Sequence, residues 1–102
     1  MEDKRHYSEN DTDTISAQNT FSTPIYIKGD FNFSLWGTWS ATVFVQRSFD
    51  EGTTWLDVEE LTDNSELIGY EPEGANYRWG IKTGGYTSGD ANGRLGQDTT
   101  AY

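Results

Sequence analysis

The sequence predicts an all-β fold, an antiparallel β-sandwich with an extended N-terminal arm. Aromatic residues make up 15% of the chain, and Thr and Val recur in short runs, which are residue types favoured in strands. Gly, Asn and Asp interrupt these runs at intervals of about ten residues, a spacing typical of sandwiches. No segment has helical periodicity of useful length. Among sandwiches, we expect an immunoglobulin-like or jelly-roll-like arrangement.

Residues 1–20 are predicted to form a polar arm, and residues 21–102 the folded domain. The arm is rich in Asp, Glu, Asn and Ser, and Ile15 is its only aliphatic anchor. Such a composition buries too little apolar surface to offset the entropy lost on ordering. We therefore expect the arm to be disordered unless a neighbouring subunit binds it.

The strands of the domain are predicted from alternating apolar and polar residues. They are residues 25–27, an edge strand headed by Pro24, and then 31–36, 39–49, 55–61, 66–70 and 76–82. Turns are predicted at 28–30, 37–38, 50–53 and 71–74, and a Gly-rich loop at 83–97 that ends in a short strand at 94–95. The predicted core positions are Phe31, Phe33, Leu35, Ala41, Val43, Val45, Leu56, Val58, Tyr77, Trp79 and Ile81.

Residues 48–55 read S-F-D-E-G-T-T-W and match the Asp-box pattern S-x-D-x-G-x-T-W. A short Asp side chain can accept hydrogen bonds from turn amides, and Gly supplies a positive φ. We expect Ser48, Asp50, Gly52 and Trp55 to build a structural hairpin. Sialidase-like enzymes repeat this motif once per propeller blade, whereas this chain has one copy, so it does not indicate sialidase activity.

Composition excludes several classes of function. Seventeen acids against seven Lys and Arg give a net charge of −10, which argues against a nucleic-acid partner. No segment approaches the ~18 apolar residues of a membrane-spanning helix, and the N-terminus lacks the apolar stretch of a secretory signal. The absence of Cys suits folding in a reducing cytoplasm, and a core this small is often supplemented by oligomerisation.

Residues 31–82 resemble small β-sandwich proteins of tailed bacteriophage particles, such as capsid-decorating and tail-associated proteins. The likeness lies in residues 46–55 and in the run Tyr77-Arg78-Trp79-Gly80. The resemblance implies a virion structural protein, made in the host cytoplasm, that decorates the capsid as a cement protein. The implied partners are the major capsid protein or other virion proteins, together with further copies of the chain. The alternatives are a tail or baseplate accessory protein and a carbohydrate-binding module.

No residue pattern indicates catalysis, a cofactor or a metal. His6 has no patterned partner, Glu59 and Glu60 point to opposite faces of a strand, and Glu71 and Glu73 flank Pro72 in a predicted turn. The oxygen ligands at Asp90, Asn92 and Asp98 do not follow the spacing of an EF-hand loop. Exposed aromatic side chains could serve core packing, a protein interface or sugar stacking. We expect interface positions at Tyr7, Ile15, Trp36, Trp39 and Tyr86, with Tyr70 a further aromatic candidate.

Overall fold

Seven strands form one continuous antiparallel sheet in the computed structural model, which describes the backbone of residues 5–101 and the side chains of residues 10–97. The described residues contain no helix, and hence none that could cross a membrane. The sheet order is β1-β7-β3-β6-β4-β5, and β2 also pairs with β6. The strands are β1 (Arg5–Ile15), β2 (Thr20–Phe21), β3 (Ile25–Ala41), β4 (Val43–Ser48), β5 (Leu56–Leu61), β6 (Ser65–Ile81) and β7 (Tyr86–Ala101).

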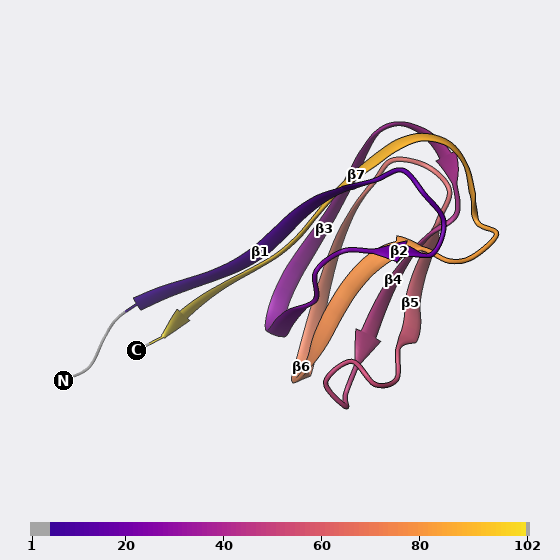
Figure 1. Ribbon diagram of the computed structural model, residues 1–102. Helices are drawn as coiled ribbons and strands as arrows, with labels where there is room; N and C mark the ends of the chain where they lie inside the picture. Colours follow the sequence, from indigo (N-terminus) through magenta and orange to yellow (C-terminus); the bar gives the residue numbers. More distant parts are fainter. Residues whose placement is uncertain (1–4, 102) are drawn as a thin grey trace.

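The sheet folds over on itself where β3 and β6 bend together. Ile27 pairs with Ala75 and Gly29 with Glu71, so one β3 residue faces three residues of β6 at this point. Gly29 and Gly74 supply positive φ angles of 102° and 89°, which bulges and sharp bends require. The two strands reverse here into a second layer (Figure 1). The predicted two-layer, all-β fold is confirmed, and both layers belong to a single sheet.

The core lies between these two layers. Phe33 of the first layer contacts Trp79 of the second with ring centroids 5.6 Å apart, and Phe31 contacts Tyr77 at 4.8 Å. The predicted core positions Phe33, Leu35, Val43, Val45, Tyr77, Trp79 and Ile81 are all buried. Burial of these side chains supplies the main driving force for closing the sheet.

Three of the predicted turns are bends inside long strands. Residues 28–30 and 37–38 lie within β3, and residues 71–74 lie within β6. Gly37, with a φ of 118°, bends β3 opposite Ala91 of β7, and the two strands arch together (Figure 1). Neighbouring strands continue to pair across each bend, so the ladder resumes instead of ending.

The predicted Gly-rich loop at 83–97 was wrong, because residues 86–101 form β7. One glycine of β7, Gly93, fits beneath bulky side chains, and a Cβ at this position would lie 2.5 Å from the Trp79 ring. A strand that is poor in its own side chains is therefore stabilised by the aromatic residues of the opposite layer.

The predicted polar arm is also largely strand. β1 pairs with β7 along its whole length, from Arg5 opposite Ala101 to Ile15 opposite Ala91. The outer parts of β1 and β7 extend together away from the folded layers (Figure 1). Polar side chains suffice for β1 because its backbone groups pair with β7.

Two predicted core positions are wrong. Leu56 and Val58 lie in β5 at the edge of the sheet and are 47% and 38% exposed. β5 pairs with β4 as predicted. The register shifts at Val58, because Val45 of β4 pairs with Glu59 whereas the next residue, Gln46, pairs with Asp57. No strand of the described chain covers this end of the second layer.

Candidate functional site

The hairpin between β4 and β5 is built by the Asp-box residues. The Ser48 hydroxyl donates to Asp50 Oδ1 at 2.7 Å and accepts from the Gly52 amide at 2.8 Å. Asp50 Oδ1 also accepts from the Thr54 amide at 2.8 Å. The hydrogen bonds from Ser48 and Thr54 lower the pKa of Asp50 to about 2. Gly52 has a φ of 92°, and Glu51 has an uncommon positive φ of 57° for a residue with a side chain.

Trp55 anchors this hairpin to the outer face of the second layer. The Arg78 guanidinium lies 4.3 Å from the Trp55 ring centroid and 3.9 Å from that of Phe21. Arg78 Nε also donates to Gln46 Oε1 at 2.9 Å, and burial lowers the pKa of Arg78. Stacking a guanidinium between two rings holds three elements, β2, β6 and the hairpin, in one arrangement.

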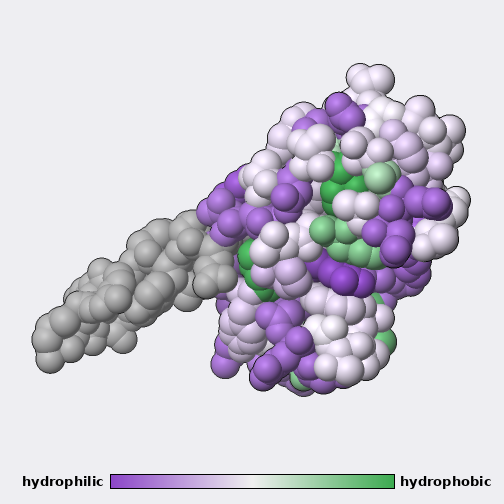
Figure 2. All heavy atoms as spheres, in the orientation of Figure 1, coloured by the Kyte–Doolittle hydropathy of each residue, from purple (hydrophilic) through white to green (hydrophobic). Residues whose placement is uncertain are grey.

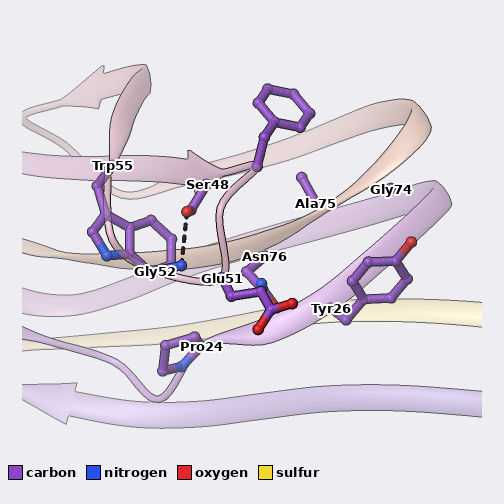
Figure 3. A pocket seen from close by; sticks show the side chains of 10 residues that line it. Pro24, Tyr26, Ser48, Glu51, Gly52, Trp55, Gly74, Ala75 and Asn76 are labelled. Atoms are coloured by element: carbon purple, nitrogen blue, oxygen red, sulfur yellow. Dashed lines mark hydrogen bonds between the residues drawn. The ribbon is translucent and has the colours of Figure 1, made fainter.

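A cleft of about 570 Å³ opens between the hairpin and the bend of the sheet. In Figure 3, Trp55 and Tyr26 lie at opposite ends of the cleft, with Glu51 and Asn76 between them. Tyr26 and Phe49 are both half exposed. The full lining is Pro24, Tyr26, Ser48, Phe49, Glu51, Gly52, Trp55, Gly74, Ala75 and Asn76.

Glu71, at the bend of β6, is a buried carboxylate with every partner inside the chain. It accepts from the Tyr77 phenol at 2.7 Å, from Arg47 Nη1 at 3.1 Å and from the Glu73 amide at 3.1 Å. Burial opposes ionisation of Glu71, but these hydrogen bonds outweigh it and lower its pKa. Burial, followed by the bond to Glu71, raises the pKa of Tyr77 to about 12. This network stabilises the bend.

Two neighbouring acids, Asp11 and Asp13, lie where β1 meets the chain before β3. Burial, together with the neighbouring Asp13 carboxylate, raises the pKa of Asp11 from 3.8 to about 6. Asp11 Oδ2 is buried without a hydrogen-bond partner, whereas Asp13 Oδ2 accepts from the Thr23 amide at 3.2 Å. Asp11 is thus held in a position that disfavours its charged form.

Residues 65–71 of β6, which we name the β6 edge, form an open border of the first layer. They pair with β3 on one side, and β4 pairs only with residues 76–80. Ile68 and Tyr70 are 89% and 67% exposed on this edge, the two most exposed large apolar side chains among those described. Their strand partners are Asn32 and Asp30.

The predicted interface residues are dispersed in the structure. Ile15 is 2% exposed and belongs to the core, so it is not available as an interface anchor in this fold. Trp36 is exposed, whereas Trp39 is partly buried and donates through Nε1 to Asn64 at 2.7 Å. The Tyr86 phenol donates to the Gly89 carbonyl at 3.0 Å. The side chain of Tyr7 lies outside the described residues.

Three exposed residues, Tyr26 and Phe49 of the cleft and Ile68 of the β6 edge, were not among the predicted site residues. Residues 67 and 68 are consecutive aliphatic residues, so strict alternation does not show which of them faces the core. The sequence does contain one signal for this exposed surface. Ile68 and Tyr70 are two positions apart, so both side chains lie on the same face of a strand.

Other candidate groups do not converge on a chemical site. Among the described side chains, no group of three or more His, Cys, Asp or Glu is placed to hold a metal ion. Asp90 and Asn92 belong to β7 instead of a loop, and Asn92 accepts from the Thr14 hydroxyl at 2.6 Å. The side chains of His6 and Asp98 lie outside the described residues.

The described residues form an all-β scaffold with a cleft and an open strand edge. Comparison with family models, curated proteins and solved structures finds no match to this chain.

Proposed function

We propose that this protein works by binding other proteins and assembling with them. The observation that carries the proposal is the β6 edge, where unpaired backbone lies beside the exposed side chains of Ile68 and Tyr70. Exposed strand edges are templates for pairing with another chain, and aromatic residues are favoured anchors of interfaces.

Two carboxylates, the buried Glu71 and the exposed Asp50 of the hairpin, are held by internal hydrogen bonds, which supports binding over catalysis at these positions. Glu71 is fully engaged by Tyr77, Arg47 and a backbone amide, and Asp50 is engaged by its own hairpin. A general acid or base needs a free position facing a substrate. On the face seen in Figure 2, the apolar areas are small and are separated by hydrophilic atoms, a pattern that suits contacts with polar rims.

Within this class, we propose a structural protein of a bacteriophage particle that decorates the outside of the capsid. The support is the resemblance of residues 46–55 and 77–80 to proteins of such particles. The partners would be the major capsid protein and further copies of this chain. A tail or baseplate accessory role is the alternative within the same class of virion proteins. The acidic surface would limit non-specific adhesion of an exposed protein.

The test is the composition of purified particles. We expect the protein to copurify with them through a density gradient. A copy number in the hundreds per particle would indicate a shell protein, and about a dozen copies would indicate a tail or vertex protein. The Ile68→Lys variant should be retained less well than Val58→Lys, which alters an exposed residue on β5, at an edge of the second layer. Absence of the wild-type protein from particles would reject the virion role.

The cleft favours a carbohydrate-binding module as a second candidate. Tyr26 and Phe49 are half-exposed aromatic residues of a cleft that Glu51 and Asn76 also line, and aromatic rings beside polar groups are the combination that sugar rings need. If the protein is a carbohydrate-binding module, a bound glycan should change the fluorescence of Trp55. The Tyr26→Ala variant should bind the glycan more weakly. Trp36→Ala, on another surface, is the control.

A further inference from the structure

The strand edges of this sheet differ in how well they are protected against pairing. β5 carries Asp57, Glu59 and Glu60 and a register shift at Val58, features that blunt an edge. Residues 10–14 of β1 are all Asn, Asp or Thr. The β6 edge instead presents Ile68 and Tyr70, and the described residues place no strand beside it. It is therefore the edge that another strand fits best.

We propose that the occupant of the β6 edge is a second copy of this chain, a proposal that rests on the assembly role given above. Two β6 edges pair antiparallel about a two-fold axis at Ile68, and the first layers of both copies join into one continuous sheet. Ile68 then faces Ile68 of the second copy. Glu66 faces Tyr70, and Ser65 faces Glu71.

The sequence of the edge is complementary to itself in this register. Directly opposite side chains interact across antiparallel strands, and opposed like charges are unfavourable. Centring the axis on Ile68 covers the most exposed apolar side chain and opposes no two carboxylates. It also sets the Tyr70 phenol, a donor, against the Glu66 carboxylate, an acceptor.

Other symmetric pairings lack this complementarity. Centring the axis on Leu67 sets Ile68 against Glu66, and centring it on Gly69 sets Leu67 against Glu71. Pairing two β5 strands about Val58 sets Asp57 against Glu59. The structure thus favours one edge and one register for a second copy.

Electrostatics predicts how the dimer responds to salt. Each copy carries a net charge of −10, so the two repel each other at long range while the contact itself opposes no like charges. Added salt screens this repulsion, and the dimer should strengthen between about 50 and about 500 mM NaCl. A basic partner strand on the same edge would show the opposite response, since salt weakens attraction between opposite charges.

The experiment measures the mass of the full chain by sedimentation equilibrium over a range of salt concentrations. We expect a dimer whose dissociation constant falls with salt and rises by about tenfold or more in Ile68→Lys. Val58→Lys, the matched control on β5, should dimerise like the wild type. Because the chain has no Cys, Ile68→Cys should give a covalent dimer with a short thiol cross-linker, and Val58→Cys should not.

The outcomes separate the two proposals. A wild-type chain that stays monomeric at all salt concentrations, or a dimer that persists in Ile68→Lys and cross-links through Val58→Cys, overturns the β6 pairing. If a wild-type chain that does not dimerise through β6 still copurifies with particles, and Ile68→Lys does not copurify, the β6 edge binds another protein and the assembly role stands. Because the Ile68 side chain is 89% exposed, its replacement should leave the core intact, and circular dichroism of Ile68→Lys checks this directly.

Discussion

At the residue scale, Glu71 shows how a buried charge is tolerated in a small core. Its carboxylate is 1% exposed and receives hydrogen bonds from Tyr77, Arg47 and the Glu73 amide. Burying a charge is costly unless it is paired and hydrogen-bonded. The three donors meet this requirement at the position where β6 must bend.

We expect Glu71→Gln to lower the free energy of unfolding by about 2 kcal/mol near neutral pH, because it leaves the donors without a charged acceptor. The folded state lowers the pKa of Glu71, so its contribution is present above the ordinary pKa of 4.5 and is lost as the pH falls below it. Urea unfolding at several pH values measures both effects. Glu73→Gln, at an exposed neighbour, should be near neutral, and equal losses in both variants would contradict this role.

Folding shifts the pKa of Asp11 in the opposite direction to that of Glu71. Its pKa is raised from 3.8 to about 6, so the folded state binds the proton more tightly than the unfolded chain does. Stability is therefore gained at low pH and lost as the pH rises from about 4 to about 6. We expect Asp11→Asn to raise the free energy of unfolding at neutral pH by roughly 1 kcal/mol, after allowing for solvent screening.

The measurement for Asp11 is thermal unfolding across that pH range. The wild type should lose stability between about pH 4 and about pH 6 by an increment that Asp11→Asn lacks. Asp63→Asn, in the exposed turn between β5 and β6, should keep the wild-type profile. A profile unchanged in Asp11→Asn would show that Asp11 is not destabilised by folding.

At the element scale, β7 shows how a strand rich in Gly becomes part of a core. Gly93 lies against the rings of Trp79 and Phe33, which take the space that its own side chain would fill. The element depends on the opposite layer, because few side chains of β7 itself bury apolar surface.

We expect Gly93→Ala to lower the free energy of unfolding by about 2 kcal/mol, because the added methyl group forces Trp79 away from the first layer. Gly85→Ala is the matched control, since its nearest atoms lie at 3.3 to 3.5 Å and can give way. Chemical denaturation followed by tryptophan fluorescence compares the two. A Gly93→Ala chain as stable as Gly85→Ala would mean that the layers do not pack in this way.

At the scale of the whole molecule, β3 and β6 each contribute to both layers. Phe33 and Trp79 meet across the core although Phe33 pairs with Leu67 within its own layer. Neither layer can therefore unfold alone without removing strands from the other.

We expect one cooperative unfolding transition, with coincident midpoints for far-ultraviolet circular dichroism and for the fluorescence of Trp79. A chain with Trp36, Trp39 and Trp55 replaced by Phe isolates the signal of Trp79 between the layers. Loss of that signal while the β-sheet spectrum persists would show that the layers separate first.

Because pairs such as Arg5 with Ala101 join distant residues, folding should take milliseconds to seconds.

Local features of the chain were readable before the structure. Residues 48–55 specify their hairpin through their own hydrogen bonds, and the alternation of residues 76–82 marks Tyr77, Trp79 and Ile81 as core positions. Of the candidate aromatic residues, Trp36 and Tyr70 are exposed. The virion role, the interface and the second copy remain predictions.

The sequence by itself determined the β class, the Asp-box turn and the core face of residues 76–81 of β6, because each depends on residues that are neighbours in the chain. Only the tertiary structure decided that the glycines at 29, 37 and 74 bend strands instead of ending them. A positive φ turns the backbone locally, but pairing with a neighbouring strand decides whether the ladder resumes. Burial of Ile15 and exposure of Leu56 likewise followed from which strand lies opposite, a fact that no local pattern contains.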